Sequence, residues 1–335
     1  MSTWKGKHGP LLIAEIGGNH EGDFDYAKRL TQLAIEADVD YIKYQIYTGD
    51  SLVNPIENPT RNKHFKKFEL TLKQYEELHQ MCTGAGIKFL ASVWDMTKLD
   101  WSDSHMDIFK IGSGDMTAYP VIEQICALGK PIIISTGLST AEEVKDCVRF
   151  IRKCNSIYEQ YDYLNVMQCT SMYPIEKKHS NLAVMLNYKK ALNVSIGYSD
   201  HTTDNEAMEV AVAMGAETLE FHFTDTRENQ TFRDHLVSLT RDEVHLLTKK
   251  IKQINILKGS EVKEPLDIEA EHRISFRRAI YPSRDMKAGT TIREDDLVYL
   301  RPCHGISATE YKQVLGMTLK TDVVKHQKLN WDLFK

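Results

Sequence analysis

The sequence predicts an α/β protein that contains a closed (β/α)8 TIM barrel followed by a small β-rich domain. Three observations support this fold class. Eight short apolar segments recur along residues 1–223, segments with helical periodicity lie between most of them, and the composition becomes polar and charged near residue 258. Alternating strands and helices are typical of a parallel sheet covered by helices. Eight such units over roughly 250 residues are typical of a barrel.

The strand candidates are either continuously apolar or alternate with a period of two. They span residues 11–17, 40–47, 88–94, 106–114, 131–136, 163–170, 194–200 and 217–223. Helical patterns occupy residues 25–37, 71–86, 119–128, 139–154, 205–215 and 241–257. A doubly wound sheet is the structural alternative. The first strand, however, is followed by GGNHEGD instead of the glycine-rich loop of a dinucleotide-binding sheet.

The boundary between the two predicted domains lies where the helical periodicity ends. The stretch KGSEVKEPLDIEAEHRIS is polar and charged, which is typical of a linker. Beyond it, short β-like runs are interrupted by Gly, Asp and Pro, as in a compact β-rich fold. We therefore expect a barrel over residues 1–260, a linker over 261–276 and a small domain over 277–335.

Composition and charge argue against several classes of protein. The 335-residue chain has a formal net charge of −5 and no long blocks of like charge, so we expect neither nucleic acid nor a membrane as a partner. No segment approaches the ~20 apolar residues of a membrane span, and the start, MSTWKGKHGP, has no apolar signal region. The six cysteines are irregularly spaced without a C-x-x-C pair. We therefore expect reduced thiols and a cytoplasmic protein.

Polar side chains gather at the carboxyl ends of the predicted strands, where barrel enzymes place their active sites. The stretch LEFHFTD (219–225) puts Glu220 and His222 on one side of the eighth strand, because residues two positions apart in a strand face the same way. His201 ends the neighbouring seventh strand, beside Asp200. Two imidazoles with nearby carboxylates suit a divalent transition metal such as Mn, Fe, Co or Zn. The sequence therefore predicts a metal site with His201 and His222 as ligands.

Lysines and hydroxyl groups lie at other strand ends. Lys43 belongs to the second strand and Lys110 to the fourth, Ser113 stands in a Gly-Ser-Gly turn, and Ser135 ends the fifth strand. Ammonium groups, hydroxyls and glycine-exposed amides are the usual parts of a phosphate or carboxylate site. Salt bridges from the lysines to nearby glutamates are the simpler alternative. An anion site beside a metal site indicates a small phosphorylated substrate.

These same stretches resemble the sialic acid synthase family, whose members make nine-carbon keto-sugar acids. The matching segments, in the family's order, are AEIGGNHEGD (14–23), KYQ (43–45), KIGSGD (110–115), GKPIIISTG (129–137), CTSMYP (169–174), IGYSDHT (196–202), EFHFTD (220–225) and RDHLVSL (233–239). In the tail, FRRAIYPSRDMKAGTTIREDDLVYLRPCHGI resembles the antifreeze-like (SAF, β-clip) domain of that family. The resemblance covers nearly the whole chain.

The resemblance implies a metal-dependent condensation of phosphoenolpyruvate with the open-chain aldehyde of an N-acetylmannosamine-like sugar, with release of phosphate. It favours Mn2+ as the metal, with Mg2+ or Co2+ as alternatives, bound by His201 and His222. By position, the catalytic residues are Glu15, Lys43, Lys110 and Glu220. The residues that contact the substrates or the waters of the metal are Gln45, Ser92, Ser113, Ser135, Ser171, Tyr173, Ser199, Asp234 and Arg301. The resemblance also implies a homodimer with swapped C-terminal domains, in which Arg301 reaches the sugar site of the other subunit.

Several positions depart from the family's pattern. Phe221 stands where a basic residue is usual, Gln168 replaces a histidine, SVWD (92–95) replaces a Thr-Pro-Phe type of turn, and the loop at 48–70 fits poorly. These departures point to a less usual acceptor, such as a 6-deoxy-diacetamido sugar that leads to legionaminic- or pseudaminic-type acids.

Three other functions are weighed against this one. A synthase acting on a sugar phosphate would need arginines near the barrel mouth, and strands one to six offer none. A metal-dependent barrel hydrolase usually carries an H-x-H motif on strand one, where this sequence has Glu15. A sugar-binding protein that had lost the chemistry would lack some of the ligands, and none of His201, His222, Lys43 and Lys110 is missing.

Overall fold

The computed structural model describes residues 2–335, and the chain divides into two compact units, Met1–Gly259 and Ser260–Lys335. Each unit encloses a hydrophobic core of its own. All six cysteines are free. No helix within residues 2–335 is both long enough and apolar enough to cross a bilayer.

Eight parallel strands form a closed barrel in the first unit, which confirms the fold class predicted from the sequence. The strands pair in chain order, and β2 pairs with β9 to close the barrel. They are β2 (Gly9–Glu15), β3 (Tyr41–Ile46), β4 (Lys88–Val93), β5 (Phe109–Ile111), β6 (Ile132–Ser135), β7 (Leu164–Cys169), β8 (Ser195–Asp200) and β9 (Thr218–His222). Each of them lies within or overlaps a predicted strand.

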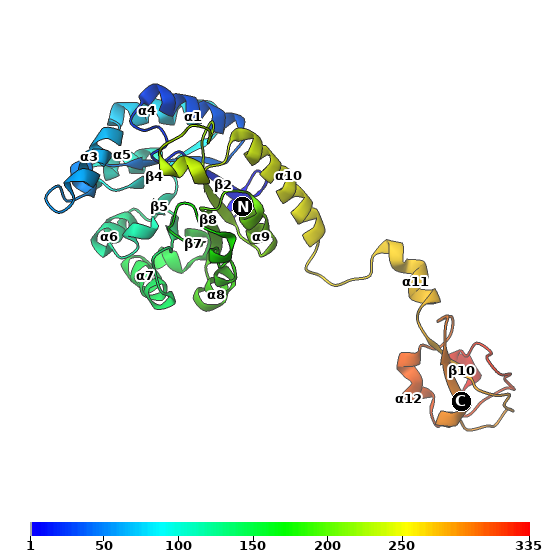
Figure 1. Ribbon diagram of the computed structural model, residues 1–335. Coiled ribbons are helices and arrows are strands. Elements are labelled where there is room, and N and C mark those ends of the chain that lie inside the picture. The colour runs from blue at the N-terminus through cyan, green and yellow to red at the C-terminus, as the bar shows by residue number, and fades with distance from the viewer. Residues whose placement is uncertain (1) are drawn as a thin grey trace. The chain divides into compact units, whose positions relative to one another are not determined.

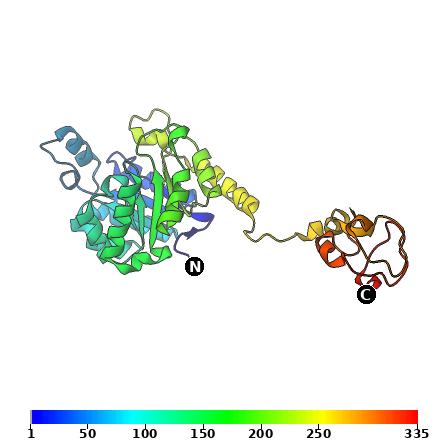
Figure 2. The same ribbon diagram turned by 90° about the horizontal axis from the view of Figure 1, so that it is seen from below.

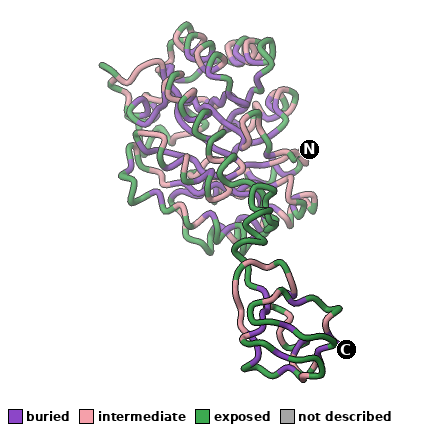
Figure 3. The backbone as a smooth tube through the Cα atoms, turned by 90° about the vertical axis from the view of Figure 1, so that its right-hand side faces the viewer, coloured by how far each residue is buried: buried purple, intermediate pink, exposed green. Residues whose placement is uncertain are grey.

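Helices surround the strands, as Figure 1 shows for the barrel unit. They are α1 (Phe24–Glu36), α4 (Leu72–Gly84), α5 (Leu99–His105), α6 (Tyr119–Ala127), α7 (Ala141–Cys154), α8 (Ala183–Leu192), α9 (Glu206–Ala213) and α10 (Arg241–Lys258). Of these, α5 and α8 were not predicted. In the barrel unit the buried backbone is concentrated in the strands and the exposed backbone in the outer helices (Figure 3).

Several helices begin at a threonine that satisfies the free backbone groups of the first turn. In α7, the Thr140 hydroxyl accepts the Glu143 N–H, while the Glu143 carboxylate accepts the Thr140 N–H at 2.7 Å. Thr71 and Gln74 form the same capping box in α4. The buried residues of α7 recur every three or four positions, so they lie on one face of the helix. They are Val144, Cys147, Val148 and Ile151.

Strand alternation decides which side chains fill the barrel. On β9, Thr218, Glu220 and His222 face the interior, whereas Leu219 and Phe221 pack in the core between the strands and the helices. The Thr218 hydroxyl donates to Asn165 Oδ1 at 2.7 Å, and Asn165 Nδ2 donates to the Ser195 hydroxyl at 2.7 Å. Thr218, Asn165 and Ser195 have no exposed surface, so they form a buried polar cluster that links β7, β8 and β9 near the starts of these strands.

The N-terminal segment covers the end of the barrel opposite the carboxyl ends of the strands. The short strand β1 (Lys5–Gly6) pairs antiparallel with the start of β2. Trp4 is 1% exposed, and its indole N–H donates to the Tyr161 carbonyl at 3.1 Å, just before β7 begins. Trp4 therefore joins the starts of two strands on different sides of the barrel.

The segment at 48–70, expected to be a loop, contains the helices α2 (Gly49–Leu52) and α3 (Pro59–Phe68). Asn58 caps α3 by accepting the Arg61 N–H, and Pro59 occupies its first position. Asn62 is buried and donates to the carbonyls of Gly49 and Val53 at 2.9 Å each, which fixes α3 against α2. Figure 2 shows this segment standing out from the barrel wall.

The second unit contains a two-stranded antiparallel sheet, β10 (Ala279–Pro282) and β11 (Leu297–Leu300), and the short helices α11 (Ala270–Ser275) and α12 (Tyr311–Val314). Its core is small and made of aliphatic side chains with Phe334. Helix α11 lies inside residues 261–276, the segment predicted to be a linker.

Candidate active site at the carboxyl ends of the barrel strands

A cavity of about 1250 Å³ opens at the carboxyl ends of the barrel strands. It brings together every predicted site residue of the barrel unit, namely Glu15, Lys43, Gln45, Ser92, Lys110, Ser113, Ser135, Ser171, Tyr173, Ser199, His201, Glu220, His222 and Asp234. The exception among the predicted residues is Arg301, which lies in the second unit with its guanidinium over the ring of Phe276 at 5.7 Å.

Two lysines and two glutamates form a buried charge network at the floor of the cavity. Lys43 Nζ lies 2.6 Å from Glu15 Oε2 and 4.0 Å from Glu220 Oε2. Lys110 Nζ lies 3.3 Å from Glu220 Oε1 and donates to the Ser135 hydroxyl at 2.7 Å. The lysine–glutamate salt bridges considered from the sequence are therefore present. Two positive and two negative groups leave the network without net charge.

Burial and neighbouring charges shift the four groups in different directions. Burial raises the pKa of Glu15, against the opposing effect of Lys43. Burial also opposes the charge of Glu220, but Lys110 and Lys43 outweigh it and lower the pKa of Glu220. Burial, together with the charge of Lys43, lowers the pKa of Lys110. Glu15 is therefore the carboxylate that takes up a proton more readily, and Lys110 is an ammonium group weakened by its surroundings.

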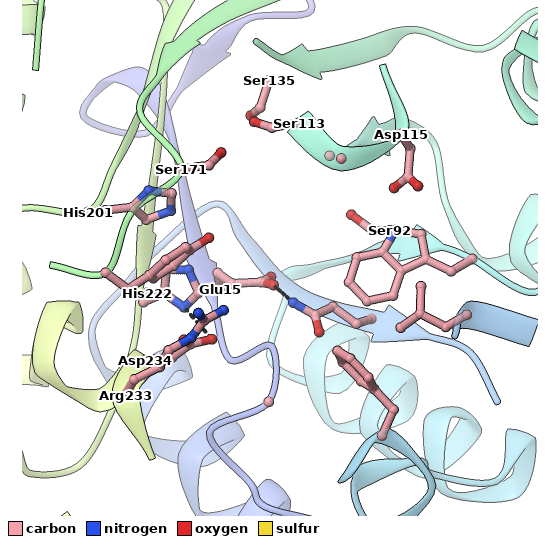
Figure 4. A pocket seen from close by; sticks show the side chains of 18 of the residues that line it. Glu15, Ser92, Ser113, Asp115, Ser135, Ser171, His201, His222, Arg233 and Asp234 are labelled. Carbon is pink, nitrogen blue, oxygen red and sulfur yellow. Dashed lines mark hydrogen bonds and ion pairs between the residues drawn. The ribbon is translucent and has the colours of Figure 1, made fainter. Parts of the chain in front are cut away.

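Hydroxyl groups line the side of the cavity next to Lys110. The Gly137 N–H donates to the Ser113 hydroxyl at 3.0 Å. A Cβ atom on Gly137 would lie 2.2 Å from Ser171 Oγ and 2.9 Å from Ser113 Oγ, so these two serines can approach only because residue 137 has no side chain. Figure 4 shows Ser113 and Ser135 together on one side of the pocket, with Ser171 nearer to His201. We call Ser113, Ser135 and Ser171 the serine side of the cavity.

His201 and His222 lie together on the adjoining side, with their ring centres 5.4 Å apart (Figure 4). His201 Nδ1 lies 2.8 Å from the Thr170 carbonyl, so it donates there and leaves Nε2 with a free lone pair. His222 Nδ1 is buried without a hydrogen-bond partner and lies 4.0 Å from Asp234 Oδ2. Burial, reinforced by positive groups that include Lys43, lowers the pKa of His222 far below its usual range.

These features fit a bound cation. Metal-binding histidines are usually neutral and donate their second ring N–H to a carbonyl or carboxylate, which is the arrangement that His201 has with the Thr170 carbonyl. Without a cation, a buried nitrogen that has no hydrogen-bond partner, such as Nδ1 of His222, lowers the stability of the fold. The two imidazoles would leave the remaining coordination positions to waters or substrate.

Asp200 does not belong to this pair, although the sequence placed it nearby. Its Oδ1 accepts the Tyr198 hydroxyl and the Thr202 N–H, both at 2.9 Å, and its Oδ2 accepts the Thr202 hydroxyl at 2.8 Å. Asp200 is therefore a support for the turn that carries His201.

The outer wall of the cavity consists of residues that were not predicted as site residues, although Trp94 and the 48–70 segment had been linked to the acceptor from the sequence. They are Tyr47, His64, Phe65, Phe68, Trp94, Asp115, Phe232, Arg61 and Arg233. Tyr47 packs against both Phe65 and Trp94, with ring centres 5.4 and 5.6 Å apart. The spacing of His64, Phe65 and Phe68 on one helical face could have indicated such a wall. Strands one to six offer no arginine, as expected, but Arg61 of the unpredicted helix α3 lines the cavity together with Arg233.

A second histidine cluster lies outside the cavity. Among residues 2–335, Glu76, His79 and His105 each offer a ligand atom within 4.8 Å of the others, so they form a group that could hold a metal ion. Glu76 and His79 belong to α4 and His105 to α5. None of the three lines the cavity.

A closed (β/α)8 barrel with a polar cavity at its strand ends, followed by a small antiparallel domain, defines a class of two-domain barrel proteins. Comparison with known families assigns the chain within that class. The NeuB family matches residues 30–263 and the SAF domain matches residues 277–335. The chain belongs to the NeuB family, which confirms the resemblance noted in the sequence.

The relatives of this chain include synthases of sialic-, legionaminic- and pseudaminic-type acids. The chain is 32% identical to the N,N'-diacetyllegionaminic acid synthase of Legionella pneumophila over 337 residues, covering 96% of this chain and 94% of that protein. It is 31% identical to the N-acetylneuraminate-9-phosphate synthase of Mus musculus, covering 87% and 83%. The crystal structure of the N-acetylneuraminic acid synthetase from Leptospira borgpetersenii, in complex with citrate, superposes with a TM-score of 0.73 at 29% identity, covering 79% of this chain and 90% of that one.

Proposed function

We propose that this protein condenses phosphoenolpyruvate with the open-chain aldehyde of an N-acetylated hexosamine to form a nonulosonic acid, with release of phosphate. The observation that carries this proposal is the meeting, in one cavity, of the serine side with Lys110, the imidazole pair and an aromatic wall. The names of the relatives support the product class. We further propose that the enzyme acts in the cytoplasm.

Phosphoenolpyruvate would lie on the floor, with its phosphate and carboxylate against the lysines and the serine side. Hydroxyls and ammonium groups that already converge need little reorganisation when an anion binds. The two lysines, however, are balanced by Glu15 and Glu220. A ligand with several negative charges therefore requires further positive charge nearby, and the adjoining imidazole pair is where a divalent cation can supply it.

His201 through Nε2 and His222 would hold the cation, and Asp234 would orient its waters, since Asp234 Oδ2 lies 4.0 Å from His222. When bound, the cation would act as a Lewis acid that polarises the aldehyde oxygen of the sugar. We propose Mn2+, because a site completed by waters and substrate oxygens suits this metal. Mg2+ and Co2+ are the alternatives.

The bond changes of the reaction define what the floor residues must do. Carbon 3 of phosphoenolpyruvate bonds to the aldehyde carbon, whose oxygen gains a proton, and positive charge develops at carbon 2. Water adds to carbon 2, and the bond between carbon 2 and the phosphate oxygen then breaks to give the keto acid and phosphate. Glu15 is held by Lys43 and by Gln45 Nε2, which donates to Glu15 Oε1 at 2.7 Å. In that position Glu15 stabilises the developing positive charge and accepts the proton of the water.

The role of Glu15 is tested by Glu15→Gln, which keeps the shape of the side chain and removes its charge. Turnover should fall by about 100-fold or more, while the KM for phosphoenolpyruvate changes little, because the charge matters most in the transition state. Phosphate release measures both constants. Glu57→Gln, at an exposed glutamate of the 48–70 segment, is the matched control. An unchanged turnover in Glu15→Gln would remove this role.

The outer wall indicates the acceptor. Aromatic side chains such as Tyr47, Phe65 and Trp94 favour apolar substituents, as in a 6-deoxy-diacetamido sugar with its methyl groups. We therefore propose a precursor of a legionaminic- or pseudaminic-type acid. A phosphorylated hexosamine is the second candidate, because Arg61 and Arg233 also line the cavity and guanidinium groups bind phosphate well.

The function is tested by incubating the full-length protein with phosphoenolpyruvate, Mn2+ and three aldoses. These are N-acetylmannosamine, its 6-phosphate and a 2,4-diacetamido-2,4,6-trideoxyhexose. Phosphate release and product mass are measured. We expect the highest kcat/KM with the diacetamido sugar. A preference for the 6-phosphate that is lost in Arg61→Ala and Arg233→Ala would favour the second candidate. No phosphate release with any sugar would overturn the proposed function.

A further inference from the structure

Glu76, His79 and His105, here called the α4–α5 cluster, lie on the outer helical layer of the barrel, where α4 and α5 are neighbours (Figure 1). Glu76 and His79 are three residues apart and therefore share one face of α4. His105 is the last residue of α5. The cluster is half-buried, and its members do not line the cavity of the candidate active site.

Both ring nitrogens of His105 face hydrogen-bond acceptors, which a neutral imidazole cannot satisfy. His105 Nδ1 lies 2.6 Å from the Trp101 carbonyl, and its Nε2 lies 2.9 Å from Glu76 Oε2. Both neighbours are acceptors, whereas a neutral imidazole carries a single N–H. Glu76 Oε2 also accepts the Trp101 indole N–H at 3.2 Å. One of the two contacts of His105 therefore requires a second positive species, either a proton or a metal ion.

His79 distinguishes between these two species. Its ring centre lies 4.6 Å from that of His105, and its Nδ1 is buried without a hydrogen-bond partner. A second proton on His105 would satisfy Glu76 but would do nothing for His79. A cation among the three residues would engage a ring nitrogen of His79 as well as balance the excess of acceptors around His105.

We propose that the α4–α5 cluster binds one Zn2+ ion through ring nitrogens of His79 and His105 and a carboxylate oxygen of Glu76, with water as the fourth ligand. Two imidazoles and one carboxylate are a common ligand set for zinc. His105 donates its Nδ1–H to the Trp101 carbonyl, which leaves Nε2 free to coordinate. Gln80 Nε2 donates to the other carboxylate oxygen of Glu76 at 3.1 Å, which orients that ligand.

Such an ion would cross-link two helices that both pack on β4. The carboxyl end of β4 carries Ser92 and is followed by Trp94, both of which line the cavity. The ion would therefore act as a structural link behind one wall of the active site, without contact to the substrates. Its loss should lower stability more than turnover.

The experiment uses the full-length, tag-free protein carrying His201→Gln and His222→Gln, so that the imidazoles of the cavity cannot bind zinc. The protein is loaded with Zn2+ and desalted, and its zinc content is measured by plasma mass spectrometry. We expect about one zinc per chain. Adding His79→Gln and His105→Gln should reduce this by at least about tenfold, whereas adding His245→Gln, a half-buried histidine of α10, should not. Because the cavity histidines are absent, this outcome is independent of the proposed function.

Two results would overturn the site. One is a desalted protein that retains no zinc, which would leave His105 as a protonated partner of Glu76. The other is a zinc content that the changes at 79 and 105 do not alter. If the variant with all four histidines changed does not fold, X-ray absorption at the zinc edge is measured instead on the folded variant with His201→Gln and His222→Gln. Two imidazole ligands are then expected, and a spectrum with sulfur ligands or fewer imidazoles contradicts the site. Zinc should also change the fluorescence of Trp101, whose ring stacks on His105 at 4.2 Å, and Trp101→Phe should abolish that change.

Discussion

Gly137 determines the shape of the serine side because it has no side chain. The residue directly follows the Ser-Thr pair at the end of β6, and the space where its Cβ would lie is taken by the hydroxyls of Ser113 and Ser171. Its backbone N–H is also bonded to Ser113. A small change at this position must therefore move two proposed ligands of the phosphate group at once.

Gly137→Ala should raise the KM for phosphoenolpyruvate by about tenfold, because the methyl group displaces Ser171 and Ser113, while the free energy of unfolding falls by about 1–3 kcal/mol from overpacking. Initial-rate kinetics and urea denaturation check the two effects. Gly84→Ala is the matched control, since a Cβ there meets no atom within 4 Å. A Gly137→Ala enzyme with unchanged KM would separate the serine side from phosphoenolpyruvate binding.

His20 predicts a pH dependence of stability. It is buried, its Nδ1 accepts the Gly22 N–H at 3.0 Å, and burial lowers its pKa to about 4. The unfolded chain has the ordinary value near 6.5, so it binds the proton more readily than the folded chain between these values. The contribution of neutral His20 to the free energy of unfolding is therefore fully present above pH 6.5 and is lost as the pH falls toward 4.

Between pH 7.5 and pH 5.0 this histidine should cost about 2 kcal/mol of unfolding free energy. Urea denaturation of the wild type and of His20→Asn at both pH values measures the effect as a difference, which removes the contributions of other buried histidines. The variant should lose less stability on acidification than the wild type. Equal losses in both proteins would show that folding does not lower the pKa of His20.

At the scale of elements, the barrel was predictable because its strands are buried on both faces. Segments such as Ile132–Ser135 are almost continuously apolar, and this pattern needs no tertiary information. Helix α3 was missed because PTRNKHFKKF is mostly polar and has no wide apolar stripe. Its position depends on Asn62, whose amide contacts are made only after the chain has folded.

The site residues were predictable where the alternation of side chains along a strand determines which of them face the barrel interior. Glu220 and His222 face inward together because they are two positions apart on β9. Ser199 and Asp200 are adjacent on β8, so their side chains point to opposite faces of the strand. The sequence alone did not show that the Asp200 carboxylate would accept hydrogen bonds from Thr202. Arg61 and Phe65 could not be placed without α3. The arrangement of the outer wall therefore required the structure, although residues 92–95 and the 48–70 segment had already indicated an unusual acceptor from the sequence.

Asn62→Ala tests α3 as part of the acceptor site. The change leaves the buried carbonyls of Gly49 and Val53 without their donor, which costs about 1–3 kcal/mol and should loosen α3 locally. The KM for the sugar should rise by about tenfold, while the KM for phosphoenolpyruvate stays within about twofold. Lys63→Ala, at an exposed position of the same helix, is the control. If both KM values rise equally, α3 supports the whole cavity and is no specific wall for the sugar.

At the scale of the whole molecule, the chain consists of two compact units, each with a hydrophobic core of its own. Arg301 belongs to the second unit and the cavity to the first. We propose a homodimer in which each second unit serves the barrel of the other subunit, as the family resemblance implies.

This arrangement predicts complementation between two defective variants. Arg301→Ala and Glu15→Gln should each be weakly active alone. When they are unfolded and refolded together, about half of the dimers are mixed, and one site in each mixed dimer has both residues intact, so about one quarter of the wild-type activity should return. Phosphate release and analytical ultracentrifugation provide the measurements. A fully active monomer, or no recovery in verified mixed dimers, would contradict the exchange of domains.

Trp4 and the buried polar cluster of Asn165, Ser195 and Thr218 lie toward the starts of the strands, away from the cavity. We therefore propose that both substrates of the proposed reaction enter at the carboxyl ends of the strands and bind in a fixed order. Phosphoenolpyruvate, the deeper ligand, would bind before the sugar, because a sugar bound first would obstruct its path. On release the order would reverse, so inorganic phosphate would leave last and compete with the next molecule of phosphoenolpyruvate.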